Sequence, residues 1–120
     1  MTPREFRRIA LGMEGASEGE HMAHPDFRAN GRIFATIAPG ARQGMIRLSP
    51  DQQQAFIAAY PEMFVPAKGA WGRSGCTMVQ FASADAEIVG EAMTLAWQSV
   101  MSTAKRKPKA KSTATKPRRR

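Results

Sequence analysis

The sequence predicts a single α+β domain, in which an antiparallel sheet of about four to five strands is packed by an N-terminal and a C-terminal helix, followed by a disordered basic tail. Three observations predict this class. The 120 residues suffice for one hydrophobic core and are too few for two. Apolar residues recur at helical spacing near both ends of the domain, and β-prone runs lie between them. Beyond residue 102, no apolar side chain is larger than alanine, so that segment cannot offset its ordering entropy.

The N-terminal helix is predicted over residues 3–13. Thr2 can cap its first turn, Pro3 suits the first helical position, and Glu5 completes a capping box. The apolar stripe of this helix, at helical spacing, consists of Phe6, Ile9, Ala10 and Met13.

A β-hairpin is predicted around Asn30-Gly31, because this dipeptide between two β-prone runs is a strong hairpin signal. The register that follows from a two-residue turn pairs Ala29 with Arg32, Arg28 with Ile33 and Phe27 with Phe34. A turn over residues 39–44 and a strand over residues 45–48 follow. Residues 20–48 are therefore expected to form an antiparallel meander.

The two faces of this hairpin differ in character. One face would carry the aromatic pair of Phe27 and Phe34. The other would carry Ile33, Ala35 and Ile37, with Arg28 among them. The sequence leaves open which of the two faces belongs to the core.

A second capped helix is predicted after the meander. The run Ser49-Pro50-Asp51-Gln52 repeats the order of cap, proline, acid and glutamine, and Pro61 ends the helix. The residues expected to point inward are Phe56, Ile57 and Tyr60.

The remaining part of the domain is predicted to hold a loop, a strand and the last helix. Residues 61–75 are rich in proline and glycine and are expected to form an exposed loop or a loosely paired strand. A strand is expected over residues 77–82. Ser83 is expected to cap the last helix, with Asp85 and Glu87 in its first turn. The apolar stripe of this helix, which runs to about residue 101, consists of Ile88, Val89, Ala92, Met93, Ala96, Trp97 and Val100.

Positive charge is concentrated at the C-terminal end. The formal net charge is +8, from 18 basic and 10 acidic residues. Residues 1–102 hold nine basic residues and all ten acidic ones, so their formal charge is 9 − 10 = −1. Residues 103–120, called the basic tail below, hold no acidic residue and nine basic ones, which are Lys105, Arg106, Lys107, Lys109, Lys111, Lys116, Arg118, Arg119 and Arg120.

The sequence predicts a cytoplasmic protein. Its N-terminus has no long apolar run and no small-residue cleavage site, which argues against a secretory signal. No stretch approaches the ~18 apolar residues of a transmembrane helix. The single cysteine, Cys76, cannot form an internal disulfide, so nothing points to an oxidising compartment. A monomer is expected.

The run HPDFRANGRIFATI at residues 24–37 resembles the signature of the MmcQ/YjbR family, in which His-Pro and Phe-Arg precede Gly-Lys-x-Phe-Ala. Arg32 stands in place of the usual lysine and keeps its charge. The order of further motifs also fits, with Phe6-Arg7 in the first helix, LSPDQQQAF at residues 48–56 and Gly-x-Trp-Gly at residues 69–72. The resemblance covers roughly residues 3–101. It implies a frataxin-like α+β fold with two hairpin wings and a proposed DNA-binding role in small bacterial proteins, whereas the basic tail is not a regular family feature.

The sequence favours neither metal binding nor catalysis. His21, His24 and Asp26 are close in sequence, but on one strand the two histidines would face opposite sides unless Pro25 forces a bend. No nucleophile motif surrounds Cys76, and no glycine-rich phosphate loop opens a helix. We therefore expect no metal, no cofactor and no enzymatic activity.

Basic residues in the predicted hairpins and loops could contact phosphates, and Trp71 between them could stack on a base. The alternative is a solvated basic surface with Trp71 as a core anchor. The candidate nucleic-acid-binding residues of the domain are Arg28, Arg32, Arg42, Arg47, Lys68, Trp71 and Arg73.

The basic tail adds a stronger indication, because its charge density binds polyanions at low salt whatever their sequence. Its nine basic residues are therefore candidate binding residues too. We expect largely non-specific binding to DNA, or to RNA, and a nucleoid-associated location. The alternative is a protein- or ligand-interaction module whose tail serves only for nucleoid localisation or solubility. A membrane surface is disfavoured, because the tail has no large apolar residue to insert.

Overall fold

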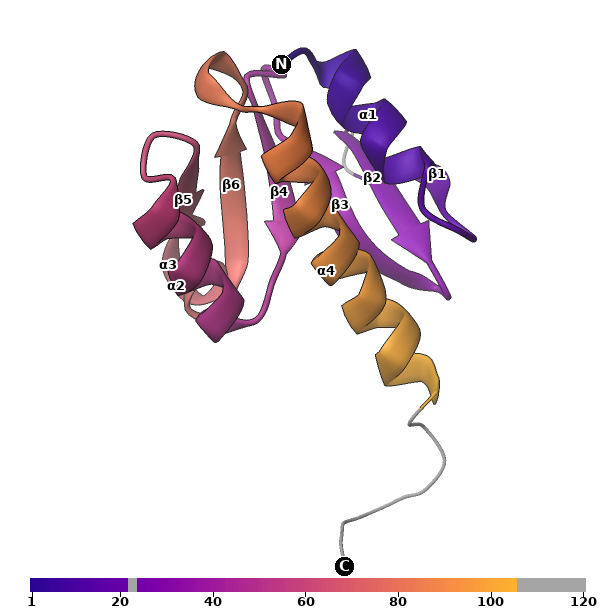
Figure 1. Cartoon of the computed structure of the whole chain (residues 1–120). Coiled ribbons are helices and arrows are strands. Elements are labelled where there is room, and N and C mark those ends of the chain that lie inside the picture. The colour runs from indigo at the N-terminus through magenta and orange to yellow at the C-terminus, as the bar shows by residue number, and fades with distance from the viewer. Residues whose placement is uncertain (22–23, 106–120) are drawn as a thin grey trace, which may run out of the picture.

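The computed structural model describes residues 1–21 and 24–105 and shows an α+β domain, as predicted (Figure 1). Its elements, in chain order, are α1 (Pro3–Leu11), β1 (Ser17–His21), β2 (His24–Ala29), β3 (Arg32–Ile37), β4 (Gln43–Arg47), α2 (Pro50–Ala59), β5 (Phe64–Pro66), α3 (Gly69–Arg73), β6 (Cys76–Gln80), a 3₁₀ turn (Phe81–Ser83) and α4 (Ala86–Lys105).

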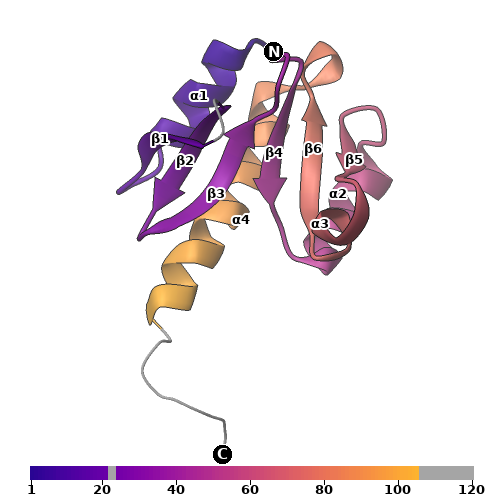
Figure 2. The ribbon, with the colours of Figure 1, turned by 180° about the vertical axis from the view of Figure 1, so that it is seen from behind.

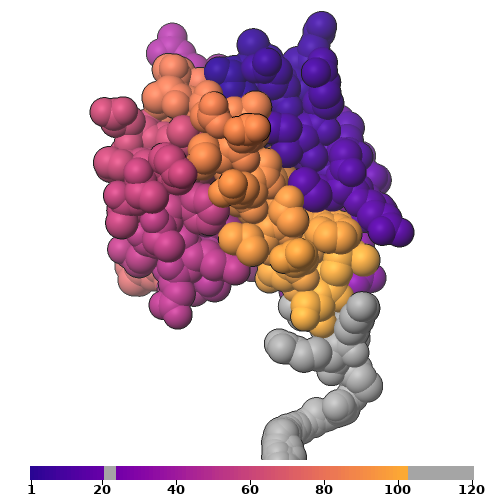
Figure 3. Space-filling model, viewed as in Figure 1, coloured from indigo at the N-terminus to yellow at the C-terminus, as the bar shows by residue number. Residues whose placement is uncertain are grey.

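The six strands form one antiparallel sheet in the order β1-β2-β3-β4-β6-β5, one or two strands more than expected. Helices α1, α4 and α2 cover one face, here called the helical face, and α4 lies between the other two (Figures 1 and 3). On the opposite face, here called the open face, the described chain places only α3, at the β5–β6 end of the sheet (Figure 2). The sheet is thus covered on one side and largely uncovered on the other.

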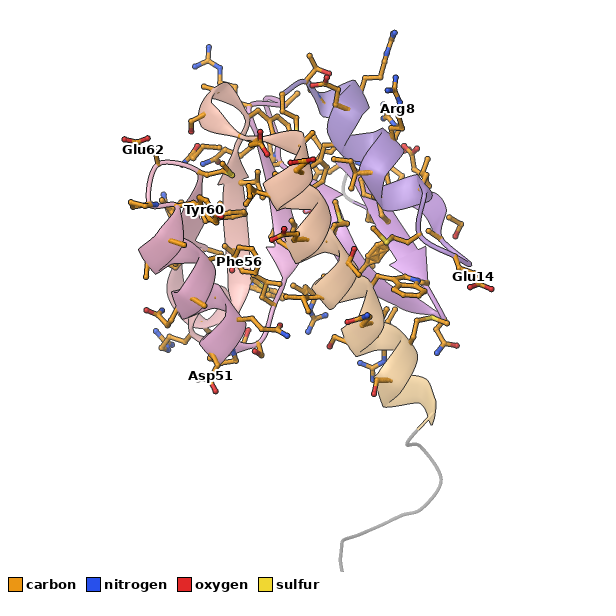
Figure 4. All side chains as sticks on the ribbon, in the orientation of Figure 1. Arg8, Glu14, Asp51, Phe56, Tyr60 and Glu62 are labelled. Atoms are coloured by element: carbon orange, nitrogen blue, oxygen red, sulfur yellow. The ribbon has the colours of Figure 1, made fainter. Side chains whose placement is uncertain are left out.

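The core lies between the sheet and the helical face. Phe6 of α1 is fully buried, and its ring centroid lies 6.2 Å from that of Phe27 and 5.3 Å from that of Phe81. Phe56 of α2 and Tyr60, which directly follows that helix, lie beside β5, where both rings pack against Phe64 (Figure 4). The buried residues of α4 are Val89, Ala92, Met93, Ala96 and Val100, which confirms most of the predicted stripe. Ile88 and Trp97 are only partly buried.

The capping boxes predicted for the first two helices are confirmed. The hydroxyl oxygen of Thr2 accepts a hydrogen bond from the Glu5 backbone N–H, and the Glu5 carboxylate accepts one from the Thr2 N–H. Ser49 and Gln52 repeat this exchange at the start of α2. Helix α1 ends at Leu11, two residues before the predicted boundary, because glycine at position 12 has a low helix propensity.

The predicted hairpin turn is present. Asn30 and Gly31 have φ angles of 57° and 77°, the left-handed conformation that a two-residue hairpin turn needs. The first two predicted pairs, Ala29 with Arg32 and Arg28 with Ile33, are confirmed.

The third predicted pair is wrong, because the register shifts by one residue. Phe27 lies opposite Ala35, so Phe34 is an extra residue on β3. A bulge of this kind places two adjacent residues opposite one and breaks the strict alternation of faces that the prediction assumed. Phe34, Ala35 and Ile37 are consequently all buried in the core, while Ile33 is only half-buried.

Strand β1 is absent from the predicted elements, because its sequence, Ser-Glu-Gly-Glu-His, shows no alternation of apolar residues. It becomes a strand by pairing along its whole length with β2. This pairing places His21 directly opposite His24 on a neighbouring strand, so the premise that both histidines lie on one strand is wrong.

The segment 61–75 is more ordered than a loop. It holds the short strand β5, which was one of the two predicted possibilities, and the helix α3, which was not predicted. Only five residues long, α3 lacks the apolar periodicity by which helices are recognised.

The cap of the last helix is also different from the prediction. The carboxylate of Asp85, rather than Ser83, accepts hydrogen bonds from the backbone N–H groups of Glu87 and Ile88. Ser83 lies in the 3₁₀ turn, and its hydroxyl donates a hydrogen bond to the carbonyl of Glu62. Helix α4 continues to Lys105, three residues beyond the predicted domain boundary at residue 102. Residues 106–120, which make up most of the basic tail, lie outside the described residues.

Truncating Met93 should destabilise the domain. Met93 is fully buried between α4 and the sheet, so Met93→Ala should lower the free energy of unfolding by about 2–5 kcal/mol. Leu11→Ala is the control, because Leu11 is exposed on α1, and it should change stability by less than about 0.5 kcal/mol. Urea denaturation measures both, and equal midpoints would show that the core is misplaced.

Two glycines should respond oppositely to alanine. Gly75 has a φ of +112°, and a Cβ there would lie 1.9 Å from the Leu48 carbonyl oxygen, so Gly75→Ala should cost at least about 2–3 kcal/mol. A Cβ on Gly90 of α4 would meet nothing within 4 Å, and Gly90→Ala should stabilise by about 1 kcal/mol through helix propensity. Thermal unfolding of both variants tests this contrast, and shifts of the same sign would contradict it.

Candidate functional site

The open face carries a hollow of about 480 Å³, which is lined by residues of β2, β3, the β3–β4 turn, β4, β6 and α3. Half-buried side chains of the central strands form its floor, namely Ile33 and Thr36 of β3, Met45 of β4 and Met78 of β6. The other lining residues are His24, Pro25, Asp26, Ile37, Ala38, Pro39, Arg47 and Trp71. Most of the lining is apolar, and its charged groups are few.

Trp71 projects from α3 at the margin of this hollow and is 67% exposed. Its backbone, by contrast, is held firmly, because the Ser74 hydroxyl donates to the Trp71 carbonyl at 2.8 Å. The predicted alternative of a core anchor is therefore wrong, and the indole is presented to solvent.

Helix α3 is fixed to the domain by Gln53. This buried α2 side chain donates from Nε2 to the carbonyl oxygens of Gly72, at 3.0 Å, and Cys76, at 2.9 Å. Gly72 also approaches the backbone of Ala67 so closely that a Cβ would lie 1.9 Å from the Ala67 oxygen. The backbone position of α3, which carries the exposed indole, is thus set by buried contacts.

Asp26 and Arg28 form an ion pair on β2. The Arg28 Nε donates to Asp26 Oδ1 at 2.7 Å and Nη2 donates to Oδ2 at 3.0 Å. The hydrogen bonds to Asp26, reinforced by its negative charge, raise the pKa of Arg28 above the ordinary arginine value. Gly19 of β1 leaves the room for this pair, because a Cβ there would lie 2.9 Å from Asp26 Oδ1.

This pair changes the interpretation of Arg28. Asp26 is 1% exposed, whereas the Arg28 side chain remains 44% exposed. Arg28 therefore compensates a buried carboxylate and still presents part of its guanidinium to solvent. Its charge is not wholly available to a ligand.

The other predicted basic residues are exposed, and they do not form one patch. Arg47 lines the hollow and makes no ion pair with any described residue. Lys68 and Arg73 bracket α3. Arg32 begins β3 and Arg42 follows its other end, so these two lie at opposite ends of the strand. The structure brings Arg47 and Trp71 together in the lining of the hollow, where the buried Asp26 also lies, paired with the more exposed Arg28. It separates Arg42 from Arg32.

The basic tail is described only at its beginning. Lys105 is the last residue of α4, and the other eight basic residues of the tail, from Arg106 to Arg120, lie outside the described residues. Their predicted role in binding therefore stays a prediction.

The apolar floor of the hollow was missed by the sequence analysis. Met45 and Met78 are directly opposite each other across β4 and β6, and neither was a candidate. The signal that could have found Met45 is the alternation in β4, where half-buried Met45 and exposed Arg47 flank buried Ile46. Which side of that alternation faces the helices depends on tertiary packing.

Among residues 1–21 and 24–105, no three His, Cys, Asp or Glu side chains are grouped so that they could hold a metal ion. The thiol of Cys76 is buried.

Arg4, Arg7 and Arg8 line a shallow surface on α1, where Arg7 pairs with Glu18 at 3.0 Å and Arg8 lies on the outer side of the helix (Figure 4). None of the described helices is long and apolar enough to cross a membrane.

The antiparallel sheet with both terminal helices on one face defines a small, open-faced α+β domain. A model of the YjbR family matches residues 11–99, and the chain belongs to that family. The crystal structure of the Deinococcus radiodurans protein DR2400, which contains a DUF419 domain, is similar, with a TM-score of 0.71 at 15% identity over 86% of this chain and 80% of that one. At this identity the likeness concerns the fold alone. No curated protein matches the chain significantly.

Removing the guanidinium of Arg28 should weaken the domain. In Arg28→Met, the buried Asp26 carboxylate loses two charge-assisted hydrogen bonds, so the urea midpoint should fall. Arg32→Met is the matched control, because Arg32 is exposed and its side chain has no hydrogen bond to a described residue. Equal midpoints for the two variants would contradict a structural role for the pair.

Proposed function

We propose that this protein binds nucleic acid, mainly through phosphate contacts and with little dependence on base sequence. The observation that carries the proposal is the charge distribution, with nine basic residues and no acidic residue in the basic tail. Such a segment neutralises phosphates and releases their counterions whatever the base sequence. DNA is the proposed partner, and RNA fits equally well because it carries the same phosphate charges. A nucleoid-associated location in the cytoplasm would follow from DNA binding.

The domain supports this proposal through exposed basic residues near the open face. Arg47 lines the hollow, Lys68 and Arg73 bracket α3, and Arg32 lies at the β2–β3 turn. These side chains can add phosphate contacts to those of the tail, which would act at high local concentration once the domain is bound.

The described helices do not offer a base-reading surface. Helix α1 has arginines but no Asn or Gln, whereas α2 has glutamines but no arginine. Helix α3 is a single turn, and α4 has no arginine. Direct readout in a major groove uses arginine with Asn or Gln on one inserted helix, so sequence-independent binding is the better match.

A second candidate function is a ligand- or protein-interaction module without enzymatic activity. The observation in its favour is the hollow on the open face, whose lining is mostly apolar and whose volume would suit a small molecule. In this case the tail would serve only for localisation or solubility.

Binding to DNA should depend steeply on salt. If about six tail charges engage phosphates, the slope of log K against log salt concentration should be roughly −5, at about −0.9 per phosphate. Replacing the eight basic residues of 106–120 by glutamine keeps the chain length and should remove most of this slope. Fluorescence anisotropy with a labelled duplex measures it, with thermal unfolding as the check on folding. Absence of binding by the full chain at moderate salt, both to the duplex and to a single strand of equal length, would refute the proposal and leave the second candidate.

A further inference from the structure

We propose that the hollow on the open face is a base-stacking site for single-stranded nucleic acid, with Trp71 as its aromatic platform. This inference rests on the proposed function and adds two points. The bound strand is unpaired, and its bases contact the sheet while its phosphates contact the basic residues around it.

The first observation is the exposed indole. Among the described residues, the large hydrophobic side chains that are exposed are Trp71 and Leu11, and Trp71 is the more exposed. Its indole N–H has no hydrogen-bond partner among those residues. Proteins that bind single strands use exposed aromatic side chains to stack on bases. Since Gln53 is hydrogen-bonded to the Gly72 and Cys76 carbonyls, the backbone of the helix that carries the indole is held in place by the buried part of the domain.

The second observation is the apolar floor beside it. The solvent-facing side of an antiparallel sheet is ordinarily polar. Here Met45 and Met78 lie opposite each other across β4 and β6, Thr36 of β3 lies opposite Met45, and Ile33 also lines the hollow. All four side chains are half-buried, and three of them are apolar. A mostly apolar surface with polarisable methionines can receive the face of a base next to the indole.

The third observation is the charge around the floor, which selects among possible occupants. Arg47 lies two residues from Met45 on β4, on the same side of the strand, and has no ionic partner in the described chain. Lys68 and Arg73 are exposed on either side of Trp71. The carboxylate of Asp26, which also lines the hollow, is neutralised by Arg28. A mostly apolar hollow with the Arg47 charge in its lining, and with two more exposed basic residues at the ends of the helix that carries Trp71, fits a polyanion with flat apolar groups better than it fits an uncharged ligand.

The same geometry favours a single strand over a duplex. In a duplex the faces of the bases are stacked on one another and cannot reach a protein surface unless a nucleotide is flipped out. In a single strand each base exposes a face, and its phosphates lie within reach of arginines beside the aromatic platform.

The test uses the full chain and a labelled oligothymidylate of about 12 nucleotides, a length within the usual site size of such proteins. Trp71→Ala should weaken binding about 5- to 150-fold, the loss expected from one stacked base, with little change in the salt slope because no charge is removed. Trp71→Phe should restore most of the affinity, because phenylalanine also stacks. The wild-type tryptophan emission should be quenched on binding.

Two matched comparisons separate base stacking from loss of an exposed apolar side chain or of an exposed charge elsewhere: Leu11→Ala with Trp71→Ala, and Arg8→Gln with Arg47→Gln. Leu11→Ala removes the other exposed apolar side chain, on α1, and should leave the affinity unchanged. Arg47→Gln and Arg8→Gln each remove one exposed charge, from the open face and from α1 respectively. Only Arg47→Gln should reduce the salt slope by about 0.7, the value for one phosphate of a single strand.

The outcomes are distinguishable. If the full chain binds neither the oligothymidylate nor a duplex of equal length, the proposed function is wrong and the stacking site with it. If it binds, but Trp71→Ala changes the affinity no more than Leu11→Ala, the stacking site is wrong and the proposed function stands. If Trp71→Ala weakens duplex and single strand equally, the hollow does not select unpaired bases. If the wild-type protein self-associates in sedimentation and Trp71→Ala abolishes that self-association, a second copy of the chain occupies the hollow and the inference is overturned.

Discussion

The packing of the Phe6 ring against the sheet is the contact on which the rest of the structure depends. Gly44 of β4 lies directly beneath this ring, so closely that a Cβ there would be 2.6 Å from the Phe6 Cζ atom. The ring also contacts Phe27 of β2 and Phe81 after β6, so α1 joins three parts of the chain that are distant in sequence. Because α1 and α4 both cover this face of the sheet, the large apolar side chains of the strands are buried against them. The opposite face of the sheet is left to the methionines, Arg47 and the indole of Trp71.

Much of the fold could be predicted because its signals are local. A capping box depends only on two residues three positions apart, and an Asn-Gly turn depends only on two adjacent residues that adopt positive φ angles. The helices α1 and α2 and the β2–β3 hairpin could therefore be predicted from the sequence. The bulge at Phe34 could not be predicted, because an extra residue on one strand is visible only when its partner strand is known. Strand β1 and helix α3 could not be predicted, for a related reason. Each is held by contacts with other elements, namely β2 and Gln53, rather than by its own periodicity.

Less of the candidate site than of the fold could be predicted from the sequence. Arg47 and Trp71 were chosen from residue type and loop context, and both line the hollow. The sequence could not group them, because grouping requires knowing which face of the sheet is covered. For the same reason it placed Arg42 with Arg32, although β3 separates them. It also could not show that Arg28 is engaged by Asp26, since a buried carboxylate two residues away is indistinguishable in sequence from an exposed one.

The two outer strands of the sheet have a consequence for self-association. An unpaired strand edge is a template on which another chain can add a strand, and natural proteins counter this hazard with charge, short length and proline. Strand β1 carries Glu18 and Glu20 along one edge, and β5, at the other, is three residues long and ends in Pro66, whose nitrogen has no hydrogen to donate. Both edges therefore disfavour growth of the sheet from one molecule into the next. Under the proposed binding to a polyanion, many such edges would come close together, and their charge, short length and proline would keep neighbouring sheets from joining.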